Sequence, residues 1–237
     1  MSARLALLAG SRAGRARVRV RGATGFVRSR AEGFLLVVDS GRWSTDFARR
    51  GLDLVNADAS VLTSAVPEID WPTLERAGLE LAEVLVLLER RVEPGDRLAP
   101  GQARRAGRRH LDAAVACDIA AFPPGHALDR VGLQDARIAT GRHRFAMRGG
   151  AAGLHAYAVS GISAHTGYLQ RLAVHPAAQR CGHGRALVRD SLAWLARHGA
   201  VTALVNTHLA NAPAIALYGQ CGFVTRPDRL GVFARRR

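Results

Sequence analysis

The segment that most constrains this chain is an apolar strand-like run that passes through a glycine-rich turn into a long amphipathic helix. The run ends at Leu172–Val174, the turn contains Gly182 and Gly184, and the helix is expected over 184–198. Glycine lets the backbone of a turn approach a ligand without a Cβ clash. The first amide groups of a helix point at that ligand, and the helix dipole favours negative charge there. The segment therefore predicts a cradle for a pyrophosphate group, with an ordinary tight connection between strand and helix as the alternative.

A second informative segment follows downstream and is expected to be a helix over 211–221. Asn211 suits the N-cap, Pro213 is tolerated in the first turn, and Gly222 ends the helix. Tyr218 lies two helical turns from Asn211, on the same face. A tyrosine on an apolar helix is more often a core residue than a catalytic one, so the spacing alone leaves both roles open.

Together the two segments resemble the GNAT superfamily of acetyl-CoA-dependent N-acetyltransferases. The residues that match the first motif are Gln179, Gly182 and Gly184, after Val174 and Pro176. Those that match the second are Asn211, Ala214, Leu217, Tyr218, Gly222 and Phe223. The resemblance is close over 168–223 and extends over 105–237 by the order of the predicted elements.

The resemblance implies a site for acetyl-CoA and an amine acceptor. The pyrophosphate would lie on the amides of Arg180–Arg185, and the pantetheine arm would pair with Leu172–Val174, whose backbone N–H would stabilise the oxyanion. Tyr218 would be the catalytic acid that protonates the CoA thiolate, and Asn211 would contact the cofactor or hold the helix start. The implied cofactor-binding residues are Leu172, Ala173, Val174, Gln179, Arg180, Cys181, Gly182, His183, Gly184, Arg185 and Asn211. No metal ligand is implied.

The general base is not identified by the sequence. Many family members carry a carboxylate on the strand before the turn, but residues 163–178 contain none. Four histidines lie near candidate positions, and a water chain is the alternative. They are His155, His165, His175 and His208. His183, inside the glycine-rich turn, is unusual for the family and would add a phosphate contact.

The rest of the chain predicts an α/β fold with a mixed central sheet flanked by helices. Residues 1–32 form a basic segment, 33–92 a small α/β block, 93–104 a linker, and 105–237 the acetyltransferase-like domain. In the basic segment, arginines alternate with Ala16, Val18 and Val20, the period of a strand, so this part is an edge strand or disordered. Further helices are expected over 110–122 and 129–140, and strands over 34–38, 79–88, 144–148, 154–162, 168–174 and 201–207. For 79–88 the composition alone also allows a helix.

The small block carries a pattern that recurs near the end of the chain. Gly78 and Leu79 follow a short helix and precede a strand, as Gly222 and Phe223 do. The block is therefore a candidate degenerate partial repeat, with chance similarity as the alternative. No glycine-rich turn precedes it, so we do not expect it to bind CoA.

Composition limits the classes of function. All 34 basic residues are arginine, which is typical of a GC-rich genome, so the net charge of +15 predicts a solvated basic surface rather than a nucleic-acid footprint. No apolar run approaches the ~18 residues of a membrane span. The three cysteines are odd in number and widely spaced, so they indicate no disulfide framework and favour a reducing cytoplasm.

We expect acetyl transfer to a primary amine, of a protein or peptide rather than a small molecule. The alternatives are a non-catalytic CoA-binding or protein-interaction module, and a nucleic-acid-associated basic protein.

Overall fold

The computed structural model describes residues 15–30, 33–98, 103–150 and 153–235. Half of the predicted basic segment and the middle of the predicted linker therefore lie outside the described residues. The chain divides into two units by its internal contacts. Unit 1 consists of residues 1–86 and 227–237, and unit 2 of residues 87–226. Unit 1 thus combines two segments from opposite ends of the sequence, whereas unit 2 is one continuous stretch.

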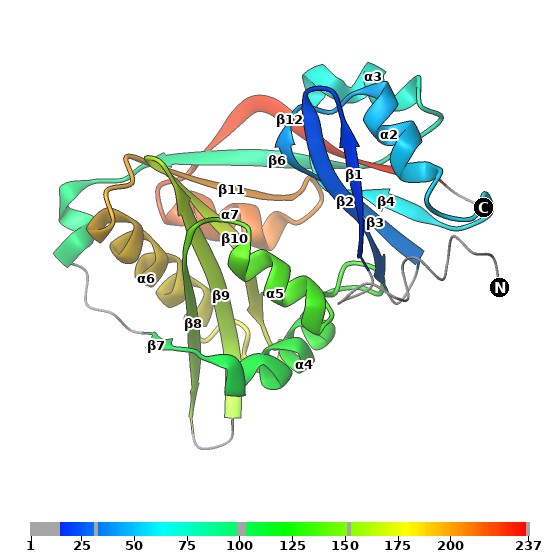
Figure 1. The fold of residues 1–237 in the computed structure, drawn as a ribbon. Coiled ribbons are helices and arrows are strands. Elements are labelled where there is room, and N and C mark those ends of the chain that lie inside the picture. The colour runs from blue at the N-terminus through cyan, green and yellow to red at the C-terminus, as the bar shows by residue number, and fades with distance from the viewer. Residues whose placement is uncertain (1–14, 31–32, 99–102, 151–152, 236–237) are drawn as a thin grey trace. The chain divides into compact units, whose positions relative to one another are not determined.

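Unit 2 is built on an antiparallel meander followed by a helix and a parallel strand (Figure 1). Its strands are β7 (Arg104–Arg105), β8 (Arg142–Gly150), β9 (Gly153–Ser163), β10 (Thr166–Val174) and β11 (Thr202–His208), together with residues 87–91 of β6 (Glu80–Arg91). Its α-helices are α4 (Leu111–Ala121), α5 (Arg130–Ile138), α6 (His183–Arg197) and α7 (Ala212–Gln220). The mixed α/β sheet predicted from the sequence is confirmed.

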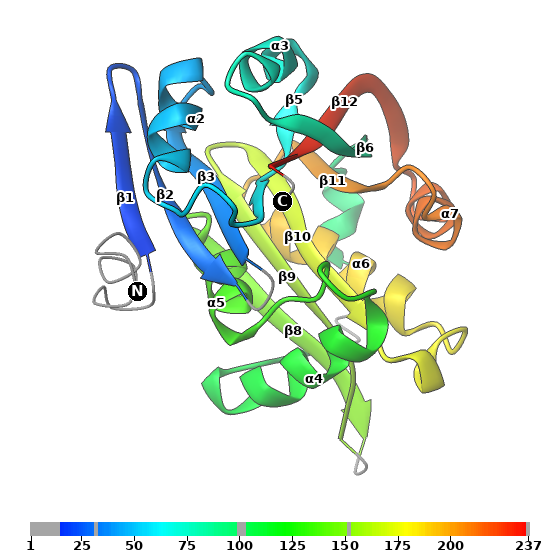
Figure 2. The same ribbon diagram turned by 90° about the vertical axis from the view of Figure 1, so that its right-hand side faces the viewer.

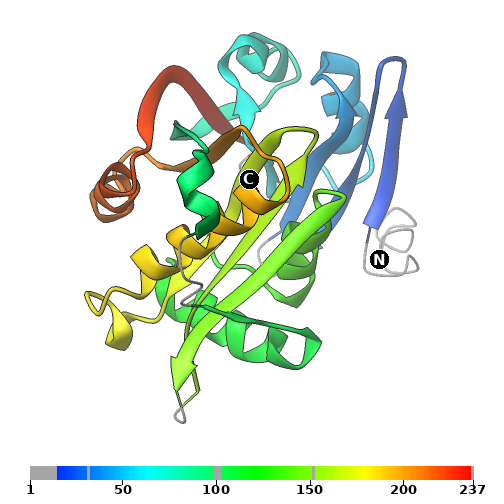
Figure 3. The same ribbon diagram turned by 90° about the vertical axis from the view of Figure 1, so that its left-hand side faces the viewer.

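The two faces of this sheet are covered by different helices. Helices α4 and α5 lie on one face of β8–β10 and α6 lies on the other (Figures 2 and 3). Side chains alternate between the faces along each strand, as the pleat requires. Tyr157 and Ala173 accordingly belong to the hydrophobic cluster that contains the buried residues of α4, whereas Ala156 and Ala158 pack against Leu187 of α6. This alternation decides which side chains of β10 reach which side of the sheet.

The predicted linker is partly folded onto unit 2. Its first half forms a 3₁₀ turn, η2 (Pro94–Leu98). The Arg97 Nε donates to the carbonyl oxygen of Ala196 at 3.0 Å, and Arg197 returns a bond to the carbonyl oxygen of Arg97 at 3.1 Å. The end of α6 is therefore held by chain that the glycine and proline content predicts as a connector.

Unit 1 has its own meander, helices and core. Its elements are β1 (Arg15–Val20), β2 (Ala23–Arg30), β3 (Gly33–Gly41), α2 (Thr45–Leu52), β4 (Val61–Thr63), β5 (Val66–Pro67), η1 (Glu68–Asp70) and α3 (Trp71–Glu75), with residues 227–235 of β12 (Val224–Arg235) paired to β4 and β5. The sequence interpretation missed β2 and α2. Of the alternatives left open for the arginine-rich run, the described residues form β1, an edge strand with Ala16 and Val18 buried.

Both units follow the same order of elements, which supports the partial repeat. In each, three antiparallel strands lead to a helix, a strand parallel to the third strand, and a second helix. The second helices end alike, with Gly78 and Gly222 at φ values of 82° and 83°. The Leu79 N–H donates to Leu74 at 3.1 Å, and the Phe223 N–H donates to Tyr218 at 3.0 Å. Leu74 therefore occupies in unit 1 the position of Tyr218 in unit 2.

Unit 1 lacks the glycine-rich turn of unit 2. Only residues 42–44 connect β3 to α2. The Ser44 hydroxyl caps α2 by accepting a hydrogen bond from the Phe47 N–H at 3.1 Å, and Trp43 is buried beside Phe47. The start of α2 is thus capped by its own chain.

Candidate functional site

The turn between β10 and α6 leaves the start of the helix open. Arg180 and Gly182 have φ values of 62° and 78°, in the left-handed region, and α6 begins at His183, one residue before the predicted start. Gly182 is the N-cap and provides no side-chain cap. The first amide groups of α6 therefore remain available to an anion. The side chains predicted to surround this anion are exposed at Gln179, Arg180, Cys181 and Arg185.

A second opening lies where β10 and β11 separate. The two strands pair only from Thr166 to Tyr168 of β10, with 202–204 of β11. Beyond Tyr168, β10 continues to Val174 without a β11 partner among the described residues. The separation exposes one edge of β10 in the centre of the sheet.

The backbone N–H and C=O groups of successive β10 residues point to opposite sides of the strand, and this alternation determines which groups face the open edge. The His175 N–H donates to the carbonyl oxygen of His155 on the β9 side at 2.9 Å. Because hydrogen-bonding directions alternate along a strand, Ala173 also faces β9, and Leu172 and Val174 face the open edge. The Gln179 side chain bonds the outward carbonyl oxygen of Val174 at 3.3 Å. Of the three predicted strand residues, Leu172 and Val174 thus present backbone groups to a ligand.

Gly184 has a packing role that the turn pattern does not predict. A Cβ added there would lie 3.0 Å from Leu217 Cδ2 and 3.7 Å from Val174 Cγ2. Gly182 is required for a different reason, since a Cβ there would meet nothing within 4 Å but its backbone is left-handed. The two glycines therefore serve close helix packing and chain reversal respectively.

Asn211 is occupied as a helix cap. Its Oδ1 accepts a hydrogen bond from the Ala214 N–H at 3.3 Å, and its Nδ2 donates to Thr207 Oγ1 at 3.0 Å. Of the two roles implied for Asn211, these contacts favour holding the helix start.

Tyr218 is buried, with 6% of its surface exposed, and its ring packs 5.8 Å from that of Phe223. The hydroxyl has no hydrogen-bond partner in the part of the chain that the structure describes. Burial raises the pKa of the Tyr218 hydroxyl to about 12, against a smaller lowering effect from the charge of Arg171. At neutral pH the hydroxyl therefore carries its proton, as a general acid must.

The four candidate histidines fall into different settings. The Nδ1 atoms of His175 and His208 accept hydrogen bonds from the amides two residues ahead, at 3.3 and 3.1 Å. His165 Nδ1 lies 3.3 Å from the carbonyl oxygen of Gly199. The ring of His155 lies 5.5 Å from that of His183, at the start of α6. Only His155 among the four thus stands at the open helix end.

An arginine lies beside His183 at the start of α6. Arg148 Nε donates to His183 Nδ1 at 3.4 Å. Partial burial, then Arg148 and His155, lower the pKa of the His183 ring. A neutral histidine beside an arginine at a helix start can gain a proton when an anion arrives.

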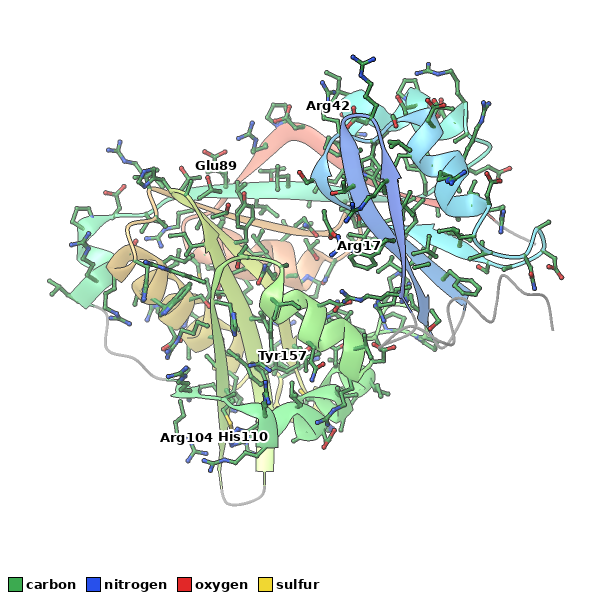
Figure 4. The ribbon with its side chains drawn as sticks, viewed as in Figure 1. Arg17, Arg42, Glu89, Arg104, His110 and Tyr157 are labelled. Carbon is green, nitrogen blue, oxygen red and sulfur yellow. The ribbon has the colours of Figure 1, made fainter. Side chains whose placement is uncertain are left out.

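The sequence interpretation missed a buried carboxylate, Asp118 of α4. It is fully buried and accepts hydrogen bonds from Arg171, from the Leu128 N–H at 2.6 Å, and from the Tyr157 hydroxyl. Tyr157 lies beside α4 (Figure 4). The only sequence signal was an acid at helical spacing from the apolar residues Leu111 and Ala114.

Two classes of site find no support in the described ranges. Within residues 15–30, 33–98, 103–150 and 153–235, no group of three or more His, Cys, Asp or Glu side chains could hold a metal ion. No helix in these ranges has the length and apolar character needed to cross a membrane.

Comparison with solved structures places the fold. A GNAT-family protein from Novosphingobium aromaticivorans DSM 12444 is similar with 16% identity and a TM-score of 0.62, over 88% of this chain and 90% of that one. A GCN5-related N-acetyltransferase from Kribbella flavida has 17% identity and a TM-score of 0.59, over 98% and 92%. A tandem GNAT protein from the clavulanic acid biosynthesis pathway has 14% identity and a TM-score of 0.60, over 90% and 78%. At these identities the likeness concerns the fold.

Comparison of sequences places the family. No curated protein matches this chain. Residues 126–223, which include the open helix start and the separated strands, match the family model of the GNAT acetyltransferases. This match identifies residues 126–223 as a segment of the GNAT acetyltransferase family.

Proposed function

We propose that the protein transfers an acetyl group from acetyl-CoA to a primary amine at the open edge of β10. One observation carries this proposal: the strand edge that presents Leu172 and Val174 adjoins the uncapped start of α6. An extended thioester with a diphosphate at its far end needs both features together. The helix start would hold the diphosphate, and the strand edge would align the arm that carries the acetyl group.

The binding arrangement follows from these groups. The diphosphate would accept hydrogen bonds from amides within Arg180–Arg185, with the exposed guanidinium groups of these two arginines nearby. The pantetheine amides would pair with the outward N–H and C=O of Val174. The thioester carbonyl would then lie at the N–H of Leu172. A fixed backbone donor at that position stabilises the negative charge that develops on the carbonyl oxygen.

The reaction is a direct transfer without an acyl-enzyme. The neutral amine nitrogen attacks the thioester carbon and forms the C–N bond, and the resulting oxyanion is held at Leu172. The C–S bond then breaks, the nitrogen loses a proton to water, and the CoA thiolate takes a proton from Tyr218. Tyr218 regains its proton from solvent, so the products are an N-acetyl amine and CoA.

Two finer assignments belong to the same proposal. We favour an amine of a protein or peptide as the acceptor. We also propose a reducing compartment such as the cytoplasm, because all three cysteines carry free thiols.

The experiment is a titration of the full chain with acetyl-CoA, followed by an assay of thiol release with a panel of peptides and small amines. Binding with a 1:1 stoichiometry and amine-dependent thiol release are expected. Binding without thiol release for any amine would instead favour a non-catalytic CoA-binding module. A chain that fails to bind acetyl-CoA would overturn the assignment of both openings.

A further inference from the structure

Arg171 stands directly beside the group that the proposed function assigns to the thioester. It precedes Leu172 on β10, at a bulge that shifts the register between Leu169 and Arg171. The bulge places the Arg171 side chain on the α4 face of the sheet, where it meets Asp118. The α6 face of β10 is already covered by α6 itself. An acceptor that attacks at Leu172 therefore approaches most directly from the side of Arg171.

The guanidinium of Arg171 is held from three sides. Its Nε and Nη2 donate to Asp118 Oδ2 and Oδ1 at 2.8 and 2.6 Å. Nη2 also donates to the carbonyl oxygen of His126 at 2.9 Å, in the segment that connects α4 to α5. The ring of Phe122 lies under the guanidinium, 3.5 Å from its central carbon. A planar group fixed in this way loses little further freedom when it makes another hydrogen bond.

The third nitrogen of the Arg171 guanidinium, Nη1, is available to a ligand. Nη1 has no hydrogen-bond partner among the residues that the structure describes, and 17% of the side chain is exposed. Asp118 is completely buried, so the pair presents only the arginine to solvent. An arginine with two nitrogens anchored and one uncommitted has the form of a binding group for an oxygen acceptor.

A second arginine of the same unit provides the comparison. Arg144 of β8 makes a matching pair with Asp190 of α6, at 2.5 and 2.8 Å. Its side chain is 18% exposed and that of Asp190 is completely buried. This pair lies on the opposite face of the sheet. It therefore serves as a control for the structural contribution of a buried arginine–aspartate pair.

We propose that Arg171 is a specificity-determining residue, whose Nη1 binds a carbonyl or carboxylate oxygen on the carbon next to the amine-bearing carbon of the acceptor. The inference rests on the proposed function and narrows its acceptor to α-amino acyl compounds, such as the free amino terminus of a peptide. In such compounds the oxygen lies three bonds from the attacking nitrogen. Leu172 would then orient the thioester while Arg171 orients the amine.

The test measures thiol release with two acceptors, alaninamide and isopropylamine, which differ by the carboxamide group. Each is assayed with the unmodified protein and with the Arg171→Met and Arg144→Met variants. Comparison across variants cancels the different basicities of the two amines. A hydrogen bond to a charged group predicts that Arg171→Met lowers kcat/KM for alaninamide by about 10- to 100-fold. The value for isopropylamine should change by less than about threefold, and Arg144→Met should affect both amines equally.

Stability must be separated from binding. Removing one partner of a buried pair is strongly destabilising, so Asp118→Asn is combined with Arg171→Met if the single variant fails to fold. Independently, the unmodified protein should have a lower KM for alaninamide than for isopropylamine when both are expressed as free base. Equal losses for the two amines, or equal KM values in the unmodified protein, would overturn the role of Arg171. Absence of turnover with every amine would overturn the proposed function, and this inference with it.

Discussion

Replacement of Tyr218 by phenylalanine separates its catalytic role from its packing role. The ring is buried against Phe223, and phenylalanine keeps that contact. The hydroxyl has no partner in the described part of the chain. The hydroxyl oxygen is not among the fully buried atoms that lack a partner, so its removal should change the free energy of unfolding by less than about 1 kcal/mol. Denaturant unfolding of both proteins measures this difference.

Activity, in contrast to stability, should fall clearly. General-acid catalysis typically contributes about 10²- to 10⁴-fold, and a thiolate is a tolerable leaving group, so we expect kcat to fall at least about tenfold. The affinity for acetyl-CoA should be unchanged by calorimetry, as expected of an interaction made in the transition state. Because the pKa of Tyr218 is raised to about 12, its ionisation should not limit kcat between pH 7 and 10. Full turnover by the variant, or a clear loss of stability, would refute this reasoning and leave Tyr218 a core aromatic.

Three further predictions concern the cofactor site and the chain that builds it. Gly184→Val should weaken acetyl-CoA binding about tenfold, on the order of 1.4 kcal/mol, whereas Gly95→Val, where a Cβ meets nothing within 4 Å, should not; calorimetric titration distinguishes them. His183 has a lowered pKa that a bound diphosphate would raise, so binding should take up a proton near pH 6.5 and strengthen as pH falls. Titrations in two buffers of different ionisation enthalpy measure this uptake, and it should disappear in His183→Gln. A chain that begins at Arg104 lacks residues 87–91 of unit 2 and should not fold, which circular dichroism would detect.

The elements of the site that rest on local signals were predictable. The N-cap Asn211 and the terminal Gly222 set the ends of α7, and the glycine-rich turn set the start of α6 to within one residue. These features depend on backbone conformations that few residues adopt, so the sequence carries them directly. The open edge of β10 was expected only through the resemblance, because strand separation depends on pairing with a distant strand.

The features that were missed depend on distant partners or weak patterns. An aspartate in a helix predicts an exposed position, and Asp118 is buried only because Arg171, 53 residues later, neutralises it. Alanines surround α4 on several sides, so its sequence does not identify the buried face. Helix α2 did carry a readable signal, the capping residue Ser44 before an amphipathic stretch.

The assignment of residues 227–235 to unit 1 has a consequence for biosynthesis. Residues 15–86 are translated before unit 2, yet the strand that pairs with β4 and β5 is translated after all of unit 2. Domains usually fold in the order of their synthesis. Here unit 2 can complete its fold while the sheet of unit 1 still lacks its last strand. The first half of the chain therefore remains the more exposed to aggregation and proteolysis until translation has passed residue 235.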